Sequence, residues 1–580
     1  MAQLGSAVFQ KKRPDPLRPR NTGCTFFEPT HPETRTRLAC ERSVTRPEAQ
    51  VGSPAEGLVL PANQPMNGFP PRSSERRKTI STNNHTSKTE QEQEPLPPIH
   101  SNPTINVFRS ILTGIDPSKC EENGENAFYV CDLAYVYRQY LRWQHTLGGR
   151  VEPFFAVKCN PDKVVLKLLA QLGMGFDCAS HAEIEMVLKL GVLSGRIIYA
   201  NPCKAGSFVR HAHSKGVEMM TFDNQDELEK VAKFHPTARM VLRILTDDSG
   251  SLCRLGEKFG APLENVRALL ERAKELNVTV IGVAFHVGSG CSNPQLYIDA
   301  VGRAKWTFEL AQELGFQFDL LDVGGGFGDD NFDILAEGLL AGLDKYFPVG
   351  CGVRVIAEPG RYFVTSAFEL ATNVIARRKA PTLPPPDAKT LGSPDHVAAA
   401  EKNDQDSPVT MYYINDGVYG AFNCIIFDHQ VVEPKVLTLG GVFYGDGFTE
   451  TGYPSGPMTP SISEHEMDCS TDSLGSLSAS SALFDARRPA PPFLVDELEL
   501  CKIFGPSCDS IDLVCPSSLL PVNRLLVGDW LRWPNMGAYT ICAASQFNGF
   551  KLSQVVYTIG DPSLDLKVRS ILSSTFTGDM

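Results

Sequence analysis

The 580-residue sequence has no run of roughly 18 apolar residues, the length that a membrane-spanning helix requires. It also has no excess of basic residues, because 55 Lys and Arg face 67 Asp and Glu and leave a net charge of −12. A general nucleic-acid-binding protein would instead carry a basic surface. We therefore expect a protein that binds neither membranes nor nucleic acids.

The usual marks of zinc and disulfide proteins are also missing. The 16 cysteines include no Cys-x-x-Cys pair, so we expect no bound metal. Segment 1–10 precedes the basic triplet Lys11-Lys12-Arg13, which reverses the charge order of a secretory signal. These features predict reduced thiols and a cytoplasmic protein.

Three segments have too few apolar residues to form a core. Residues 1–100 are rich in Pro, Ser, Thr, Asn, Arg and Glu. Segment 377–408 contains a triple proline, and segment 455–492 contains a serine-rich run. We predict a disordered N-terminal tail and two disordered insertions, because ordered loops of this length are uncommon inside compact domains.

Between the tail and the first insertion, apolar strand-like runs alternate with helical patterns. The eight strand-like runs are 154–158, 175–177, 196–200, 219–223, 240–245, 278–286, 318–323 and 353–358. Helical patterns between them include 182–190, 225–234, 262–276, 296–314 and 334–346. This alternation predicts an α/β fold, a (β/α)8 TIM-like barrel over residues 125–365, with a doubly wound open sheet as the alternative.

After Arg361 the pattern changes to β-type runs separated by turns. These runs are 363–372, 409–415, 431–439, 511–513, 525–530 and 539–542. They predict an all-β domain, a barrel or sandwich, over residues 366–580. The earlier run Phe128–Asp132 is expected to pair with this domain, which would place a site in the cleft between the two domains.

Residues with chemical capability fall at the ends of the predicted barrel strands, where the active sites of such barrels form. They are Lys158, Asp177, Asn201, Asp223, Arg243, His286, Gly324 to Gly326 and Glu358. Each has an ordinary explanation by itself, such as a turn-forming Asp or Gly or a capping Asn. Their combination at the strand ends predicts an active site.

Several of these residues together describe a pyridoxal phosphate site. Lys158 follows a buried strand, where desolvation should lower its pKa and favour the neutral amine that attacks a carbonyl. The glycines 324–326 predict a backbone cradle for phosphate, and Arg361 offers a bidentate cation for the same group. Glu358 suits a ring nitrogen that must stay protonated, while His286 could stack on the ring.

The chain resembles the eukaryotic ornithine decarboxylases, which are fold-type III pyridoxal phosphate enzymes, and above all their fungal members. The resemblance covers most of residues 106–571 outside the two insertions. The motifs that carry it are Phe155-Ala-Val-Lys-Cys-Asn160, Phe176-Asp-Cys-Ala-Ser180, Tyr199-Ala-Asn-Pro-Cys-Lys204, Phe285-His-Val-Gly-Ser-Gly290, Glu358-Pro-Gly-Arg361 and Gly505-Pro-Ser-Cys-Asp509.

This resemblance implies a role for each matching position. Lys158 would bind the cofactor covalently, His286 would stack on its ring, and Glu358 would pair with the ring nitrogen. The implied phosphate ligands are Ser289, Gly324, Gly325, Gly326, Arg361 and Tyr539, and the implied supporting polar residues are Asp177, Glu183 and Arg243.

The resemblance also implies a substrate and partners. Asp428 and Asp509 would bind the distal ammonium of L-ornithine, and Cys508 would protonate the α-carbon to give putrescine, the first step of polyamine biosynthesis. Cys508 and Asp509 would come from the partner in a homodimer with shared active sites. Segment Gly206–Lys230 lies where relatives bind antizyme, so antizyme is a further candidate partner.

Two departures and two alternatives remain at this point. Gly328 stands where the family usually has a proline, and Phe427 stands where a tyrosine is common beside the substrate aspartate. One alternative is a catalytically inactive paralogue that resembles the antizyme inhibitors. The other is a decarboxylase of lysine, arginine or meso-diaminopimelate.

Overall fold

The computed structural model describes residues 95–119, 124–379, 409–444 and 498–574. Most of the predicted tail and insertions therefore lies outside the described residues. Two differences fall inside them. Ile99–His100, predicted as tail, form strand β1 on strand β21 (Gln554–Thr558), and residues 377–379, predicted as insertion, end strand β13 (Phe368–Lys379). In both cases the backbone continues a ladder with a neighbouring strand, and this pairing outweighs the polar composition.

Eight parallel strands form a closed barrel, which confirms all eight predicted runs. In barrel order they are β3 (Glu152–Ala156), β4 (Gly175–Cys178), β5 (Ile197–Tyr199), β6 (Met219–Phe222), β7 (Arg239–Arg243), β9 (Thr279–Ala284), β11 (Leu320–Asp322) and β12 (Arg354–Ala357). The open-sheet alternative is thereby excluded.

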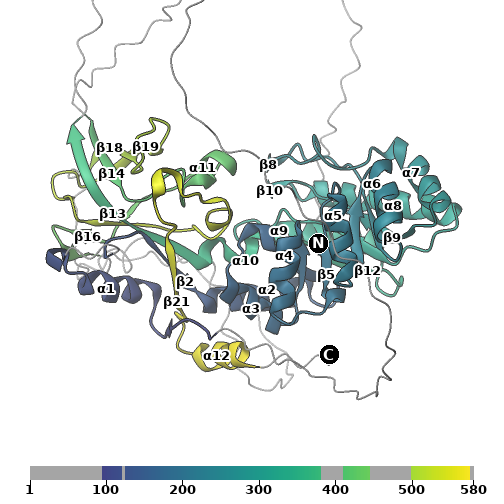
Figure 1. The fold of residues 1–580 in the computed structure, drawn as a ribbon, viewed down its shortest axis with the longest axis horizontal. Helices are drawn as coiled ribbons and strands as arrows, with labels where there is room; N and C mark the ends of the chain where they lie inside the picture. The colour runs from purple at the N-terminus through teal and green to yellow at the C-terminus, as the bar shows by residue number, and fades with distance from the viewer. Residues whose placement is uncertain (1–94, 120–123, 380–408, 445–497, 575–580) are drawn as a thin grey trace, which may run out of the picture. The chain divides into compact units, whose positions relative to one another are not determined.

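Helices surround the barrel strands (Figure 1). They are α2 (Leu133–Leu147), α3 (Lys163–Gln171), α4 (His181–Lys189), α5 (Gly206–Ser214), α6 (Gln225–Phe234), α7 (Leu263–Glu275), α8 (Gln295–Glu313) and α9 (Phe332–Tyr346). Several begin with a side-chain cap that the sequence supplies. For example, Asp162 accepts hydrogen bonds from the backbone N–H groups of Val164 and Val165 at 3.0 Å each.

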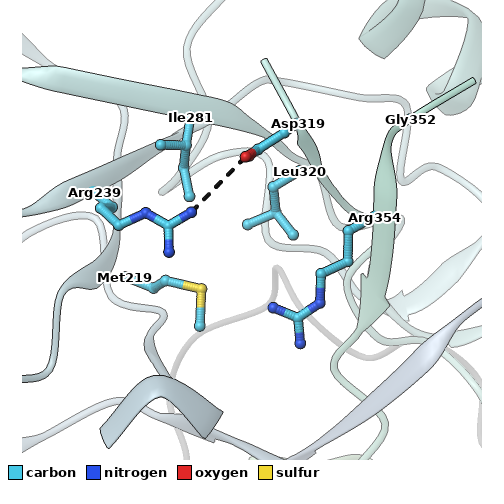
Figure 2. Close-up of a pocket in the computed structure, with 7 residues that line it drawn as sticks. All are labelled: Met219, Arg239, Ile281, Asp319, Leu320, Gly352 and Arg354. Carbon is cyan, nitrogen blue, oxygen red and sulfur yellow. Dashed lines mark ion pairs between the residues drawn. The ribbon is translucent and has the colours of Figure 1, made fainter. Parts of the chain in front are cut away.

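Apolar side chains fill the interior of the barrel. Phe154, Ile198, Met219, Val241, Ile281, Ala284, Leu320 and Ile356 form one buried cluster. At the N-terminal ends of the strands, a pocket of about 170 Å³ is lined by Met219, Arg239 and Arg354 among others. Figure 2 shows Arg239 and Arg354 at this pocket, at the starts of β7 and β12. Arg354 also lies 5.5 Å from the Phe154 ring, so its stem covers the apolar cluster.

The second region is a sheet in the order β1-β21-β2-β13-β14-β18-β19, with β20 and β15 branching from β13. Its further strands are β2 (Phe128–Asp132), β14 (Thr410–Ile414), β15 (Lys435–Val436), β18 (Glu499–Phe504), β19 (Leu513–Leu520) and β20 (Trp530–Trp533). The pairing of β2 with β13 confirms that the segment before the barrel belongs to this sheet.

Small elements complete the described chain. Two small two-stranded sheets pair β8 (Ser251–Cys253) with β10 (Ser289–Cys291) and β16 (Thr438–Leu439) with β17 (Val442–Phe443). The remaining helices are α1 (Thr104–Gly114), α10 (Arg361–Val364), α11 (Asn423–Phe427) and α12 (Asp565–Ser573). No helix in the described part of the chain has both the length and the apolar character needed to cross a bilayer.

Several predicted β runs differ from the structure. Runs 511–513 and 525–530 each reach a strand only at their last residue, because β19 begins at Leu513 and β20 at Trp530. The first half of 363–372 is helical, because α10 and a 3-10 turn occupy residues 361–367 before β13 begins. The run 539–542 is a turn, in which Tyr539 takes a positive φ of 55° and Ile541–Ala543 form a 3-10 helix. Tyr539 donates its backbone N–H to the Cys159 carbonyl at 3.0 Å, so a contact with the barrel replaces strand pairing.

Candidate active site

Lys158 lies just beyond the C-terminal end of β3, in the 3-10 turn Val157–Cys159. Asn160 fixes this turn, because its Nδ2 donates to the Gly537 carbonyl at 2.8 Å. The Lys158 ammonium forms an ion pair with Asp177, which lies near the end of β4 and is fully buried. Burial acts to lower the pKa of Lys158, but the Asp177 and Glu358 carboxylates outweigh it and raise the pKa. The predicted lowering of this pKa is therefore wrong.

His286 follows β9 and is held as a neutral imidazole. Its Nδ1 accepts the Gly288 backbone N–H at 2.9 Å, which leaves the ring proton on Nε2. Burial lowers the pKa of His286 well below its usual value, and the nearby charges of Arg243 and Lys158 lower it further. The ring therefore offers an uncharged aromatic face in the cleft.

Glu358, at the end of β12, forms a hydrogen-bonded acid pair with Asp322 of β11. Asp322 is fully buried and accepts the Gly324 backbone N–H at 2.9 Å. Burial raises the pKa of Asp322 to about 7 and raises that of Glu358 well above its ordinary value. The Asp322 carboxyl raises the pKa of Glu358 further, whereas the hydrogen bond with Glu358 lowers that of Asp322. The pair therefore retains a proton near neutral pH.

The glycines after β11 form the predicted cradle. Gly324 and Gly326 have positive φ values of 66° and 116°. A Cβ on Gly324 would lie 2.3 Å from the Phe285 carbonyl oxygen, and one on Gly325 would lie 2.8 Å from that of Glu358. The Tyr297 hydroxyl donates to the Gly325 carbonyl at 2.7 Å. Only glycine fits here, and the loop carbonyls are tied back into the protein.

Arg361 opens helix α10 and brings the next predicted residues together. Its guanidinium donates to Ser289 Oγ at 3.0 Å and to both carboxylate oxygens of Asp428 at 2.8 Å. Its Cζ lies 5.0 Å from the Tyr539 ring centroid. Ser289, Arg361, Tyr539 and Asp428 thus form one cluster beside the glycine cradle.

Glu183 and Arg243 support this region from the side. The Glu183 carboxylate accepts the Ala179 backbone N–H at 2.5 Å, and burial raises its pKa. The Arg243 guanidinium lies 5.2 Å from the Phe259 ring and acts electrostatically on His286 and Asp322. Both residues are therefore placed where the resemblance implied a polar network.

Cys508 and Asp509 are not brought to this cluster within the chain. They lie in the turn between β18 and β19, and both are at the surface or half-exposed. Asp509 accepts the Tyr419 hydroxyl at 2.5 Å and the Ile511 backbone N–H at 3.1 Å. Among the contacts of the described residues, Asp509 has none with a residue of the barrel.

The two departures from the family have different surroundings. Gly328 donates its backbone N–H to the Asn331 side chain at 2.6 Å, and Asn331 donates to the Cys291 carbonyl at 2.7 Å. The next residue, Asp329, accepts from Gln139 at 3.0 Å and from Arg142 at 2.8 Å. Phe427 is 69% exposed and adds no polar group beside Asp428.

Four supporting residues were not predicted from the sequence. Asp322, Tyr297, Asn331 and Cys253 each contact a predicted site residue or the glycine loop. Asp322 carried the clearest indication, because it is the polar residue that ends the seventh barrel strand. The other three reach the site from helix α8, from the residue before α9 and from strand β8.

The residues fit pyridoxal phosphate by two observations. First, the glycine cradle leaves no room for side chains and lies beside Ser289 and Arg361, which are a hydroxyl and a cation suited to phosphate. Second, the buried Asp177 Oδ1 has no hydrogen-bond partner. The described residues contain no cluster of His, Cys, Asp and Glu that could hold a metal ion.

Comparisons with known proteins agree with this chemistry. Residues 133–365 match the family model described as the pyridoxal-binding domain of pyridoxal-dependent decarboxylases, and residues 471–537 match the C-terminal sheet domain of the same family.

Two relatives and one solved structure show how far the similarity extends. An ornithine decarboxylase of Schizosaccharomyces pombe is 46% identical over 78% of this chain and 88% of its own. Antizyme inhibitor 2 of Xenopus laevis is 43% identical over 78% and 85%. The crystal structure of an arginine decarboxylase from Paramecium bursaria Chlorella virus has a TM-score of 0.61 and 30% identity, and it covers 78% of this chain and all of that one.

Proposed function

This chain belongs to the pyridoxal-dependent decarboxylases, among the ornithine decarboxylases, and from that premise we propose that it converts L-ornithine to putrescine and carbon dioxide. The observation that carries this proposal is the set of residues at the C-terminal strand ends. There the Lys158–Asp177 ion pair, the Glu358–Asp322 acid pair, the glycine cradle and Asp428 lie in one connected cluster.

Each residue has a defined task in this reaction. Lys158 is the amine that binds the cofactor covalently, and the Asp177 carboxylate favours a positive charge on the Lys158 Nζ. The glycine loop, Ser289, Arg361 and Tyr539 hold the phosphate. When bound, pyridoxal phosphate supplies an electron-poor ring that accepts the electron pair left by departing carbon dioxide.

The remaining residues keep protons and charges in place. Glu358 holds a proton at the ring nitrogen, and neutral His286 offers the ring an aromatic face without a competing charge. Asp428 receives the distal ammonium of the substrate. An apolar side chain at that position of the substrate would leave a buried charge unpaired, which disfavours amino acids without a second amine.

The proposal includes a homodimer in which each site takes Cys508 and Asp509 from the partner subunit. Its support is that both residues lie away from the cluster in their own chain, whereas the reaction needs an acid at the α-carbon. Mixing Lys158→Ala with Cys508→Ala subunits tests this. Random pairing of shared sites should restore about a quarter of the parent activity. Sites built within one chain would restore none.

Cys508 has its own test. The thiol returns a proton to the α-carbon, so Cys508→Ala should misplace protonation and release an aldehyde by-product. The measurement is product analysis after reaction with L-ornithine. Formation of clean putrescine by this variant would refute the role of Cys508.

Two further expectations belong to the proposal. A cytoplasmic location is supported by the twelve cysteines in the described ranges, which are all free thiols. A fluorescent fusion would locate the protein. Antizyme binding by segment Gly206–Lys230 is supported by resemblance, and a pull-down with the segment's exposed Lys215 reversed in charge would test it.

The decisive experiment is carbon dioxide release from L-ornithine by the purified protein, with and without pyridoxal phosphate. Lysine and arginine serve as competing substrates, and Lys158→Ala is the control. We expect cofactor-dependent release that is strongest with ornithine and absent in the variant. No release from any amino acid would favour a regulatory protein like the antizyme inhibitors.

A further inference from the structure

Arg361 contacts two subsites at once. Its Nη2 donates to Ser289 Oγ at 3.0 Å, on the phosphate side. The same guanidinium donates to both oxygens of Asp428 at 2.8 Å, on the side assigned to the substrate ammonium. The Arg361 side chain is 20% exposed and that of Asp428 only 8%, so water screens this pair weakly. One cation therefore serves both subsites.

Neighbouring groups hold this pair in place. The guanidinium lies 5.0 Å from the Tyr539 ring, and the Arg361 carbonyl accepts the Thr365 hydroxyl at 2.8 Å. On the other side, the Cys253 thiol lies 3.8 Å from Asp428 Oδ1. Cys253 also pairs with Ser289 in the two-stranded sheet of β8 and β10. Because both partners are enclosed, a charge bound at one subsite acts directly on the other.

The charges around the Arg361–Asp428 pair decide whether binding at one subsite strengthens or weakens binding at the other. The Arg361–Asp428 pair is neutral by itself. An ammonium placed on Asp428 would leave one excess positive charge in the enclosed cluster, and a phosphate placed on Arg361 would leave excess negative charge. With both present, the order phosphate, guanidinium, carboxylate, ammonium puts every charge beside an opposite one, which is favourable at low effective dielectric.

We propose that Arg361 and Asp428 couple the two subsites, so that the cofactor's phosphate and the substrate's distal ammonium bind cooperatively. This inference rests on the proposed function, because it takes the two ligand classes from it. Such coupling is reciprocal, and typical values are about 5- to 150-fold in affinity. We expect about a tenfold effect, because the pair is enclosed and only two side chains separate the two ligands.

Calorimetric titration of the full-length apoprotein tests the coupling without catalysis. Putrescine is titrated in the presence of pyridoxine 5′-phosphate, which lacks the aldehyde and so forms no bond with Lys158, or in the presence of unphosphorylated pyridoxine. We expect the putrescine Kd to be about tenfold lower with the phosphorylated compound. The reverse titration should give the same factor. Equal putrescine affinity in both conditions would overturn the inference.

Asp428→Asn separates coupling from a merely structural role. The amide keeps the shape but removes the charge that neutralises Arg361, so pyridoxine 5′-phosphate should bind at least as tightly as to the parent protein. A packing role for Asp428 predicts weaker phosphate binding, and that result would overturn the inference. Asp509→Asn is the matched control, because Asp509 contacts Tyr419 rather than Arg361. It should weaken putrescine binding but keep the coupling factor.

The outcomes also distinguish this inference from the proposed function. A holoenzyme that releases carbon dioxide from L-ornithine, while its apoprotein shows no coupling, would refute the cooperative role alone. Absence of both carbon dioxide release and putrescine binding would refute the proposed substrate together with the coupling.

Discussion

The barrel strands carry buried apolar residues inside the barrel and site residues just beyond their C-terminal ends. Towards the N-terminal end, Met219 and Leu320 begin β6 and β11 and belong to the apolar cluster. At the C-terminal end, Lys158 pairs with the buried Asp177, and Glu358 pairs with the buried Asp322. Burying apolar groups stabilises a fold, whereas burying carboxyls costs stability unless they are paired. The apolar residues towards the N-terminal end of the barrel therefore stabilise the fold, whereas the residues at its C-terminal end serve the reaction.

The largest expected effect at the chemical end is the loss of Lys158. Lys158→Ala removes the amine that binds the cofactor, and we expect kcat/KM for L-ornithine to fall by about 10⁴-fold or more. The fold should persist, because the Lys158 side chain is 42% exposed and takes no part in the apolar core. Activity and circular dichroism are the two measurements. Lys189→Ala, at the exposed end of α4, is the control and should change neither.

Met219→Ala, towards the N-terminal end of the barrel, should lower stability and leave activity unchanged, the opposite of Lys158→Ala. Met219 is 4% exposed, and β6 supplies no residue to the proposed site. Truncation leaves a cavity and should lower the free energy of unfolding by about 2–5 kcal/mol. The kcat of the folded enzyme at low temperature should stay that of the parent. Loss of activity without loss of stability would contradict the division between the two ends.

Much of the fold was predictable from the sequence because its dominant pattern is local. Each barrel strand is a short apolar run between turn residues, so all eight were located. The failures have tertiary causes. Tyr539 was predicted in a strand because it lies in an aromatic and β-branched run, but its backbone hydrogen bond to Cys159 places it in a turn. No local pattern contains that contact.

The residues of the candidate site could be predicted from the sequence, but the direction of the Lys158 pKa shift could not. Lys158 and Glu358 were identified by position alone, at strand ends. The direction of the Lys158 pKa depends on Asp177, which is 19 residues away in sequence and reaches the lysine only when β3 and β4 pair. Burial alone suggested a lowered pKa, and the ion pair reverses it.

The acid pair of Asp322 and Glu358 predicts that one substitution at the C-terminal end of the barrel should stabilise the protein. Burial raises the pKa of Asp322 to about 7, so the folded state binds more protons than the unfolded state between about pH 4 and pH 7. Stability from this group is therefore lost as pH rises through that window. Asp322→Asn removes the loss and should make the apoprotein more stable than the parent at pH 8, by about 1–3 kcal/mol.

Unfolding in urea at several pH values measures this difference. It should shrink as the pH falls towards 4, where Asp322 is protonated in both states. Asp319→Asn is a suitable control because Asp319 is 62% exposed at the opposite end of the same strand. If Asp322→Asn were less stable than the parent at pH 8, the hydrogen bond from Gly324 to a charged carboxylate would outweigh the burial cost.

The smallest effect is expected from an arginine at the N-terminal end, and it sharpens the contrast with Arg361. Arg239 lies 3.9 Å from Asp319, and the two side chains are 44% and 62% exposed. Figure 2 shows this pair at the pocket rim. Exposed pairs with such long contacts contribute little, so Arg239→Gln should change unfolding free energy by less than about 0.5 kcal/mol and leave activity unaltered.

Arg361 makes 2.8 Å contacts with a carboxylate that is 8% exposed, so the same substitution there should remove phosphate binding. Thermal melts and cofactor titrations of the two variants compare the ends directly. A measurable change in cofactor affinity for Arg239→Gln would mean that a charge at the N-terminal end of the barrel influences cofactor binding at the C-terminal end.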